Sequence, residues 1–198
     1  MGTLVFRLTP RVLRLGYAWL SSTALPKLVQ PFLERLSEET HESCSASLLD
    51  GHEIVYIARS AQRRIMSVGL STGSRLPAFC TSMGRVLLAS LPDDELQSRL
   101  ATLPLQRHTA HTATDLPTLL ERIRQARTQG WCLVNQELEE GLISIAAPLP
   151  NRLGQTVAAL NISGQANRPS AELMQHTLLP PLLRAAQTIS RLMGAPRR

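Results

Sequence analysis

The stretch "RLPAFCTSMGRVLLASLP", residues 75–92, brings together residue types that could do chemistry. A proline and a run of small and hydroxylated residues precede an apolar pattern with helical spacing, which predicts a turn that leads into a helix. Such a turn could present Cys80 or Ser82 as a nucleophile, or offer the free N–H groups of the helix start to an anion. It could also do neither, with Thr81 or Ser82 capping the helix and Cys80 packed into the core.

A nucleophile needs a base, and the residues next to Cys80 in the sequence offer no His or Asp. The motif "SMGR" places Arg85 where acyl-serine enzymes carry a lysine base, and a guanidinium does not deprotonate in proteins. The spacing also matches neither the Walker A nor the Rossmann phosphate loop. This local chemistry permits a carboxylate or another polar ligand at the helix start, and simple N-capping by Thr81 or Ser82 is the competing interpretation.

Polar residues also interrupt apolar strands. In "LNISG", Asn161 and Ser163 are two residues apart and therefore face the same side of a predicted buried strand. Ser144 in "GLISIAAPL" is placed similarly. Buried polar groups need hydrogen-bond partners, which could come from the protein or from a small molecule in an apolar pocket.

The remaining clusters give weaker signals. Glu137, Glu139 and Glu140 could do acid–base work or bind a metal, although an exposed acidic loop is more common. His108 and His111 have no Cys or carboxylate at ligand spacing, so two solvated loop histidines are expected there. The three cysteines are far apart and odd in number, which argues against a disulfide framework and against a zinc site. The sequence predicts no metal and no cofactor.

The composition is that of a soluble globular protein. Of the 198 residues, 43% are apolar and 18% are charged. No apolar run approaches the length of a membrane span, and no signal peptide is recognisable, so a cytoplasmic protein without membrane attachment is expected. The net charge of +6 comes from the ends, since residues 1–30 and 173–198 each carry four basic residues and no acid. The body therefore lacks the basic stripe of a DNA-binding surface.

Hydrophobic periodicity and turn signals predict the elements that position these residues. A helix begins at Thr9 and a second one covers residues 24–43; a hairpin turns at Asp50-Gly51, and residues 63–77 contribute a third strand and a Gly-rich loop. Three helices follow, then three strands within residues 131–164, and a final helix that Pro180 and Pro181 should kink or break. Hairpins rather than βαβ units imply an α+β domain with an antiparallel sheet.

Five stretches carry a family resemblance: "LTPRVLRLGYAWLSS", "LLDGHEIVYIARS", "GSRLPAFCTSMGRVLLA", "GWCLVNQELEEGLISIAAPL" and "AALNISG". Together, and in this order, they resemble IclR-family transcriptional regulators, especially the branch that regulates aromatic-acid catabolism. The resemblance implies a remnant of a winged helix-turn-helix domain at residues 1–8, a linker helix at 9–23 and an effector-binding domain at 24–198. That domain would be GAF/PAS-like, a curved antiparallel sheet flanked by helices.

The resemblance also implies a function and a site. The chain would be a piece of a longer regulator that binds promoter DNA through an N-terminal domain not included here, and it would form a homodimer or homotetramer. It would sense a small carboxylated effector and would not be an enzyme; a hydrolase or transferase that uses Cys80 or Ser82 is the alternative. Some family members hold a metal in this domain, but no supporting cluster is seen in this sequence. The implied effector site comprises an apolar wall of Ile65, Val68, Leu76 and Leu142, the backbone N–H groups of Ser82 and Met83, and the polar side chains of Ser144, Asn161 and Ser163. Where relatives that bind small keto acids have an acidic residue, this sequence has Val134, or Asn135 if the register is shifted by one residue.

Overall fold

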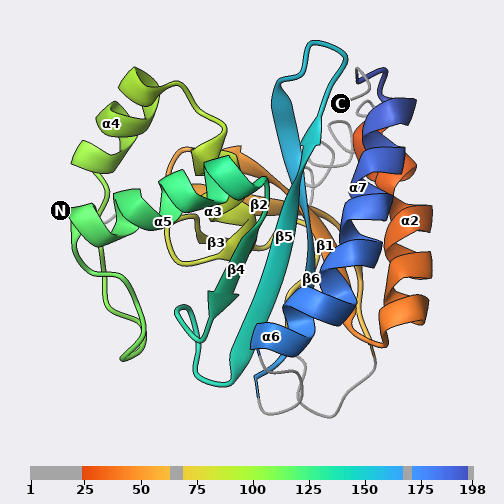
Figure 1. Cartoon of the computed structure of the whole chain (residues 1–198), viewed down its shortest axis with the longest axis horizontal. Coiled ribbons are helices and arrows are strands. Elements are labelled where there is room, and N and C mark those ends of the chain that lie inside the picture. The colour runs from red at the N-terminus through yellow and green to blue at the C-terminus, as the bar shows by residue number, and fades with distance from the viewer. Residues whose placement is uncertain (1–23, 63–68, 167–170, 196–198) are drawn as a thin grey trace, which may run out of the picture.

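A curved six-stranded antiparallel sheet forms the middle of the protein, with the strand order β3-β2-β1-β6-β5-β4 (Figure 1). The computed structural model describes residues 24–62, 69–166 and 171–195. The strands are β1 (Ser43–Asp50), β2 (Glu53–Ser60), β3 (Arg75–Pro77), β4 (Cys132–Asn135), β5 (Leu142–Pro150) and β6 (Thr156–Gln165). Each neighbouring pair is antiparallel, so the α+β class and the GAF-like sheet predicted from the sequence are confirmed.

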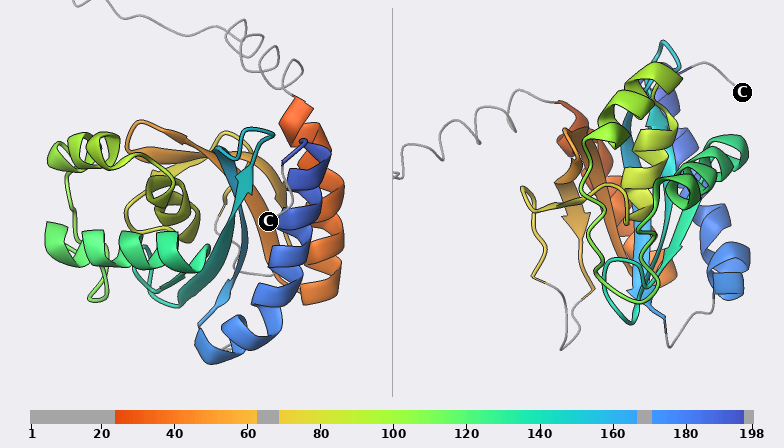
Figure 2. Two further views of the ribbon diagram at one scale, coloured as in Figure 1. Left: turned by 45° about the horizontal axis from the view of Figure 1, so that its top comes forward. Right: turned by 90° about the vertical axis from the view of Figure 1, so that its left-hand side faces the viewer.

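Helices cover both faces of the sheet (Figures 1 and 2). On one face lie α2 (Ala24–Thr40) and α7 (Leu179–Leu192), which follows α6 (Ala171–Leu173) and a π-helical turn (Met174–Leu178). On the other face lie α3 (Ser82–Ala89) and α5 (Leu116–Gln129), with α4 (Asp93–Ala101) beyond them. Among the described residues, no helix is long and apolar enough to cross a membrane.

The alternation of side chains along the strands builds a separate hydrophobic core on each face. Along β5, Ile143, Ile145 and Ala147 pack against α2 and α7, whereas Ala146 joins the core beneath α3 and α5. Because successive strand residues point to opposite faces, Ser144 also points toward α3. The sheet therefore carries a small-residue face under the start of α3.

Local signals in the sequence explain several of the observed element ends. Gly51, in the turn between β1 and β2, has a φ of 61°, which fits the Asp-Gly preference of tight hairpin turns. Gly130 ends α5 in the left-handed region with a φ of 76°. The proposed remnant at residues 1–8 and the linker helix at residues 9–23 lie outside the described residues.

Pro180 and Pro181 lie where the last helix changes, in agreement with the prediction that they would kink or break it. The regular α-helix does not run through from Ala171 to Leu192, and the two prolines lie in the first turn of α7. A π-helical turn directly precedes them. Prolines are tolerated at a first helical turn because their missing N–H groups would have no acceptor there.

Candidate functional site

A cavity of about 830 Å³ lies between the start of α3, the small-residue face of the sheet and the turn after β4. This volume falls in the range of small-molecule sites. Eight of the residues expected at the site line this one cavity: Leu76, Ser82, Met83, Val134, Leu142, Ser144, Asn161 and Ser163. The other two, Ile65 and Val68, lie outside the described residues. Whether any of them contacts a ligand remains a prediction.

The start of α3 forms one end of the cavity. Thr81 is the N-cap residue, because its extended backbone lets its Oγ1 accept a hydrogen bond from the Gly84 N–H at 3.3 Å. The same hydroxyl donates to the Pro77 carbonyl at 3.0 Å. Thr81 rather than Ser82 is therefore the cap, and the N–H groups of Ser82 and Met83 have no acceptor inside the helix.

Gly84 allows this turn to fold closely over α3. A Cβ atom at position 84 would lie 2.1 Å from the carbonyl oxygen and 2.4 Å from the Cα of Ala78. Only a residue without a side chain fits this approach. Because position 84 has no side chain, the 78–81 segment can pack directly against the first turn of α3.

The floor of the cavity follows from the strand register. Ser45 on β1 lies opposite Asn161 on β6, and two residues away Ser43 lies opposite Ser163. Ser163 in turn lies opposite Ser144 on β5. Of these residues, Ser43, Ser144, Asn161 and Ser163 line the cavity, and their small polar side chains leave space above the sheet.

Arg59 also lines the cavity, and sequence reasoning missed it. Ala46 pairs with Ala58 and Ser47 pairs with Tyr56, so Ile57 is an extra residue that forms a β-bulge in β2. Strict alternation would turn Tyr56 and Arg59 to opposite faces, but the bulge shifts the phase by one residue and both face the cavity. No turn or glycine in this segment marks the bulge in the sequence.

Three buried polar atoms on the cavity wall have no hydrogen-bond partner in the described part of the chain. They are Arg59 Nε, Ser82 Oγ and Asn161 Oδ1, and the fourth such atom, Ser190 Oγ, belongs to α7 on the other side of the sheet. Leaving a buried polar atom unpaired costs about 1–3 kcal/mol, and such atoms are rare in folded proteins. Their residues line the cavity, but the three atoms themselves are buried beneath its surface.

Cys80 is placed as a core residue. It is fully buried, and its Sγ lies 4.0 Å from the Pro77 carbonyl. Burial raises the pKa of the Cys80 thiol to about 12, and the Arg85 charge offsets only part of this effect. A nucleophilic cysteine needs a lowered pKa, so this thiol has the opposite character.

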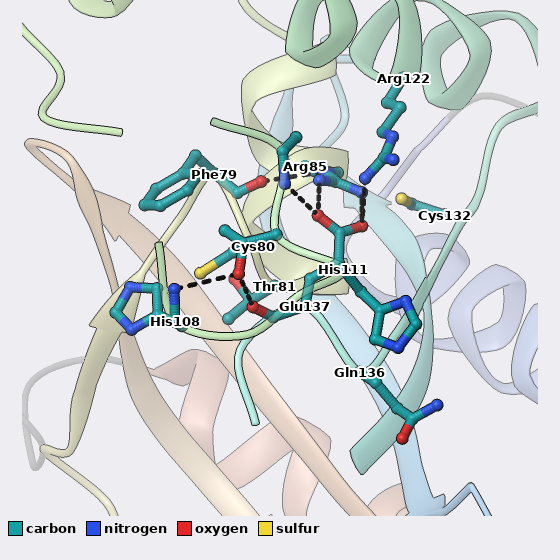
Figure 3. Close-up of polar contacts among 12 residues, drawn as sticks. Phe79, Cys80, Thr81, Arg85, His108, His111, Arg122, Cys132, Gln136 and Glu137 are labelled. Atoms are coloured by element: carbon teal, nitrogen blue, oxygen red, sulfur yellow. Dashed lines mark hydrogen bonds and ion pairs between the residues drawn. The ribbon is translucent and has the colours of Figure 1, made fainter. Parts of the chain in front are cut away.

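The expectation of an exposed acidic loop is wrong for Glu137 and correct for Glu139 and Glu140, which are exposed. Glu137 is buried, and both of its carboxylate oxygens bind the guanidinium of Arg85, which is also buried (Figure 3). Arg122 Nη1 lies 2.8 Å from Glu137 Oε1. Arg85 is 52 residues away in the sequence, so only the folded chain shows this pairing.

This ion pair anchors the wall of the cavity. Residues 134–138 alternate, with Val134, Gln136 and Leu138 facing the cavity, while Asn135 and Glu137 face a second hollow on the other side. Hydrogen bonds from Thr109 to the Gln136 carbonyl and from Thr112 to the Glu137 carbonyl hold the same segment. The wall is thus fixed from outside the cavity.

The two loop histidines, His108 and His111, are exposed. In residues 24–62, 69–166 and 171–195, no group of three or more His, Cys, Asp or Glu side chains is placed to hold a metal ion. The described residues therefore give no support for a metal-dependent site.

A GAF-like sheet with an open, largely apolar cavity on one face is the architecture of a small-molecule-binding domain. Residues 17–191 match the C-terminal domain of the bacterial transcriptional regulator IclR, and the chain belongs to this family. It corresponds to the effector-binding domain of an IclR-type regulator.

Three relatives show how close the match is. The chain is 46% identical to the Pca regulon regulatory protein of Pseudomonas putida over 185 residues. The aligned region covers 93% of this chain and 64% of that protein. It is 53% identical to RHA06195 of Rhodococcus sp. RHA1, with a TM-score of 0.89 over 93% of this chain and 75% of that one. It is 38% identical to the PobR inducer-binding domain from Acinetobacter, solved as a double mutant with 3-hydroxybenzoic acid, with a TM-score of 0.81 over 86% of this chain and 99% of that one. The chain thus spans less than two thirds of the length of the Pseudomonas regulator.

Proposed function

We propose that this domain senses a small aromatic carboxylic acid in the cavity between α3 and the sheet. The observation that carries the proposal is a cavity of about 830 Å³ at the start of α3, lined by apolar side chains together with Arg59, Ser82 and Asn161. Two of the relatives point to the class of ligand: one regulates a Pca regulon, and the other was solved with 3-hydroxybenzoic acid.

The start of α3 is the end that would receive the carboxylate. The N–H groups of Ser82 and Met83 have no acceptor inside the helix, and the N-terminus of a helix favours negative charge. Ser82 lines the cavity at the same place, and its hydroxyl has no hydrogen-bond partner among the described residues. Leu76, Leu142 and Val134 would contact the aromatic ring, since all three line the cavity.

Regulation would follow from a ligand-dependent shift between arrangements of the intact protein. A ligand shifts such an equilibrium only by its difference in affinity for the two states. The segment N-terminal to this domain would contact promoter DNA, and the regulator would work in the bacterial cytoplasm, where that DNA lies. A homodimer or homotetramer fits the symmetry of most oligomeric regulators.

An enzymatic role has little support in the site. The Cys80 thiol is held in its protonated form by burial. The Ser82 hydroxyl has no hydrogen-bond partner among the described residues, so no base is placed to activate it. The cavity is therefore better suited to binding than to acyl transfer.

A thermal-shift screen of aromatic and aliphatic acids tests the proposal. A ligand at 100 times its dissociation constant adds about 2.7 kcal/mol of stability, which corresponds to a rise in melting temperature of roughly 5–10 °C for a domain of this size. Ser82→Ala should reduce this rise, whereas Ser190→Ala, which removes an unpaired hydroxyl on α7, should leave it unchanged. If no aromatic acid raises the melting temperature, the proposed function is refuted.

A further inference from the structure

The second hollow, on the other side of the 134–138 wall, is a separate space of about 460 Å³. It lies between α5, the end strand β4 and the segment of α6 and the π-helical turn. It shares no lining residue with the cavity under α3. Among the described residues that line it, Glu137 is the only carboxylate, whereas two arginines, a histidine and several side-chain amides face the same space. The lining is therefore rich in hydrogen-bond donors.

The charges at this hollow do not cancel. Both oxygens of the Glu137 carboxylate already bind the guanidinium of Arg85, so Arg85 neutralises this carboxylate. Arg122 extends from α5 to the same carboxylate, with its Nη1 2.8 Å from Glu137 Oε1 (Figure 3). Two guanidinium groups thus share one carboxylate. Because the Arg122 side chain is 37% exposed, the excess positive charge lies at the surface of the hollow.

Neutral donors on α5 flank this charge. Gln125 and Gln129 follow Arg122 after three and seven residues, so the three side chains lie on one face of the helix, and all three line the hollow. Gln129 Nε2 donates to the Trp131 carbonyl at 2.7 Å, which fixes its position, whereas Gln125 is exposed. The helix therefore presents a cation with a free amide group beside it.

The edge of β4 adds backbone donors. β4 is the last strand of the sheet, so one of its edges has no neighbouring strand. The Gln136 N–H donates to the Leu142 carbonyl, and in an antiparallel pair only every second residue bonds the partner strand. Leu133 and Asn135 therefore turn their N–H groups away from β5, and both residues line the hollow. Such N–H groups at a strand edge are available to an acceptor.

We propose that this hollow is a second ligand site, which binds a small oxyanion such as phosphate or an aliphatic dicarboxylate. Arg122 supplies the charge, because a guanidinium binds carboxylate and phosphate oxygens through parallel N–H groups and its contact with Glu137 engages only one side of it. Gln125 and the N–H groups of Leu133 and Asn135 donate to the remaining oxygens. This site does not depend on what binds in the cavity under α3.

An NMR titration of the ¹⁵N-labelled chain with inorganic phosphate and with succinate tests the site, with chloride at equal ionic strength as the reference. One of the two anions should shift the signals of the Leu133 and Asn135 N–H groups and the Trp131 indole N–H until they saturate, and the comparison shows which class of oxyanion is preferred. If neither anion shifts these signals more than chloride does, the proposal is overturned. It is also overturned if the saturating shifts occur only at Ser82 and Met83, because the anion then binds in the other cavity.

Variants on α5 separate a specific site from general attraction to a basic protein. Arg122→Gln should weaken anion binding about 10-fold or more, the effect of losing hydrogen bonds to a charged group. Arg124→Gln removes the same charge from an exposed position of the same helix outside the hollow, and should change the affinity less than about twofold because salt screens it. Equal weakening by both substitutions would refute the site.

Gln125→Glu gives a second test that leaves the ion pairs intact. Gln125 is exposed, so the fold should be retained, and the new carboxylate would repel an anion held by Arg122. Saturable shifts of the hollow's signals should then disappear. Unchanged anion affinity in this variant would contradict the proposal.

Discussion

The buried ion pair between Arg85 and Glu137 allows a sharp prediction about stability. The two side chains are only 2% and 6% exposed, and their contact joins α3 to the turn after β4. Glu137→Gln keeps the size of the side chain but leaves the Arg85 charge buried without its counterion. Removing one partner of a buried pair typically costs 3–5 kcal/mol, because the remaining charge is uncompensated.

The chain offers a matched control in Arg184 and Glu39. These residues also form an arginine–glutamate pair, at 2.9 Å, but their side chains are 65% and 56% exposed. Exposed pairs contribute about 0–1 kcal/mol, so Glu39→Gln should change the free energy of unfolding very little. In urea unfolding, Glu137→Gln should lower the free energy of unfolding by about 3–5 kcal/mol. For a domain of this size, that loss corresponds to roughly 6–20 °C in melting temperature.

A double variant distinguishes the uncompensated charge from a simple loss of packing. Arg85→Met combined with Glu137→Leu removes both charges, and replacing a buried pair by apolar residues is often close to neutral. The double variant should therefore be more stable than Glu137→Gln alone. If Glu137→Gln costs no more than Glu39→Gln, or if the double variant is the least stable of the three, the reasoning is refuted.

Two further predictions concern α3 and α5. Gly84→Ala should destabilise the protein by about 3 kcal/mol or more, because the new Cβ would lie 2.1 Å from the Ala78 carbonyl oxygen; Gly69→Ala, where a Cβ meets nothing within 4 Å, should cost little in the same urea titration. The pKa of the Asp115 carboxyl is held below its usual value by hydrogen bonds from Thr118 at the start of α5. A lowered folded-state pKa gives stability that is present above the usual carboxyl range and lost as the pH falls through the folded-state pKa. Asp115→Asn should therefore weaken the decline of unfolding free energy below about pH 4, and an unchanged pH profile would contradict the assignment.

Much of the fold could be predicted from the sequence because its signals are local. The Asp50-Gly51 turn, the Asp115 cap and the Gly130 helix end each depend on residues within a few positions of one another. The two-residue period of a strand likewise indicates which side chains share a face, such as Asn161 and Ser163 in β6. Family resemblance then placed Ser82, Ser144 and Asn161 at one site, and the structure brings them to one cavity.

The sequence by itself determined the order of the elements, the cap of α3 to within one residue and the polar character of the strand under it. Only the tertiary structure decided that Glu137 is buried, because its partner Arg85 comes from another element 52 residues away. Only the structure turned Arg59 into the cavity, because a bulge arises from the pairing of two strands and not from the residues of one. Helix caps and turns depend on neighbouring residues, so the sequence predicts them. Burial and the direction of a side chain depend on which distant segments come into contact in the fold.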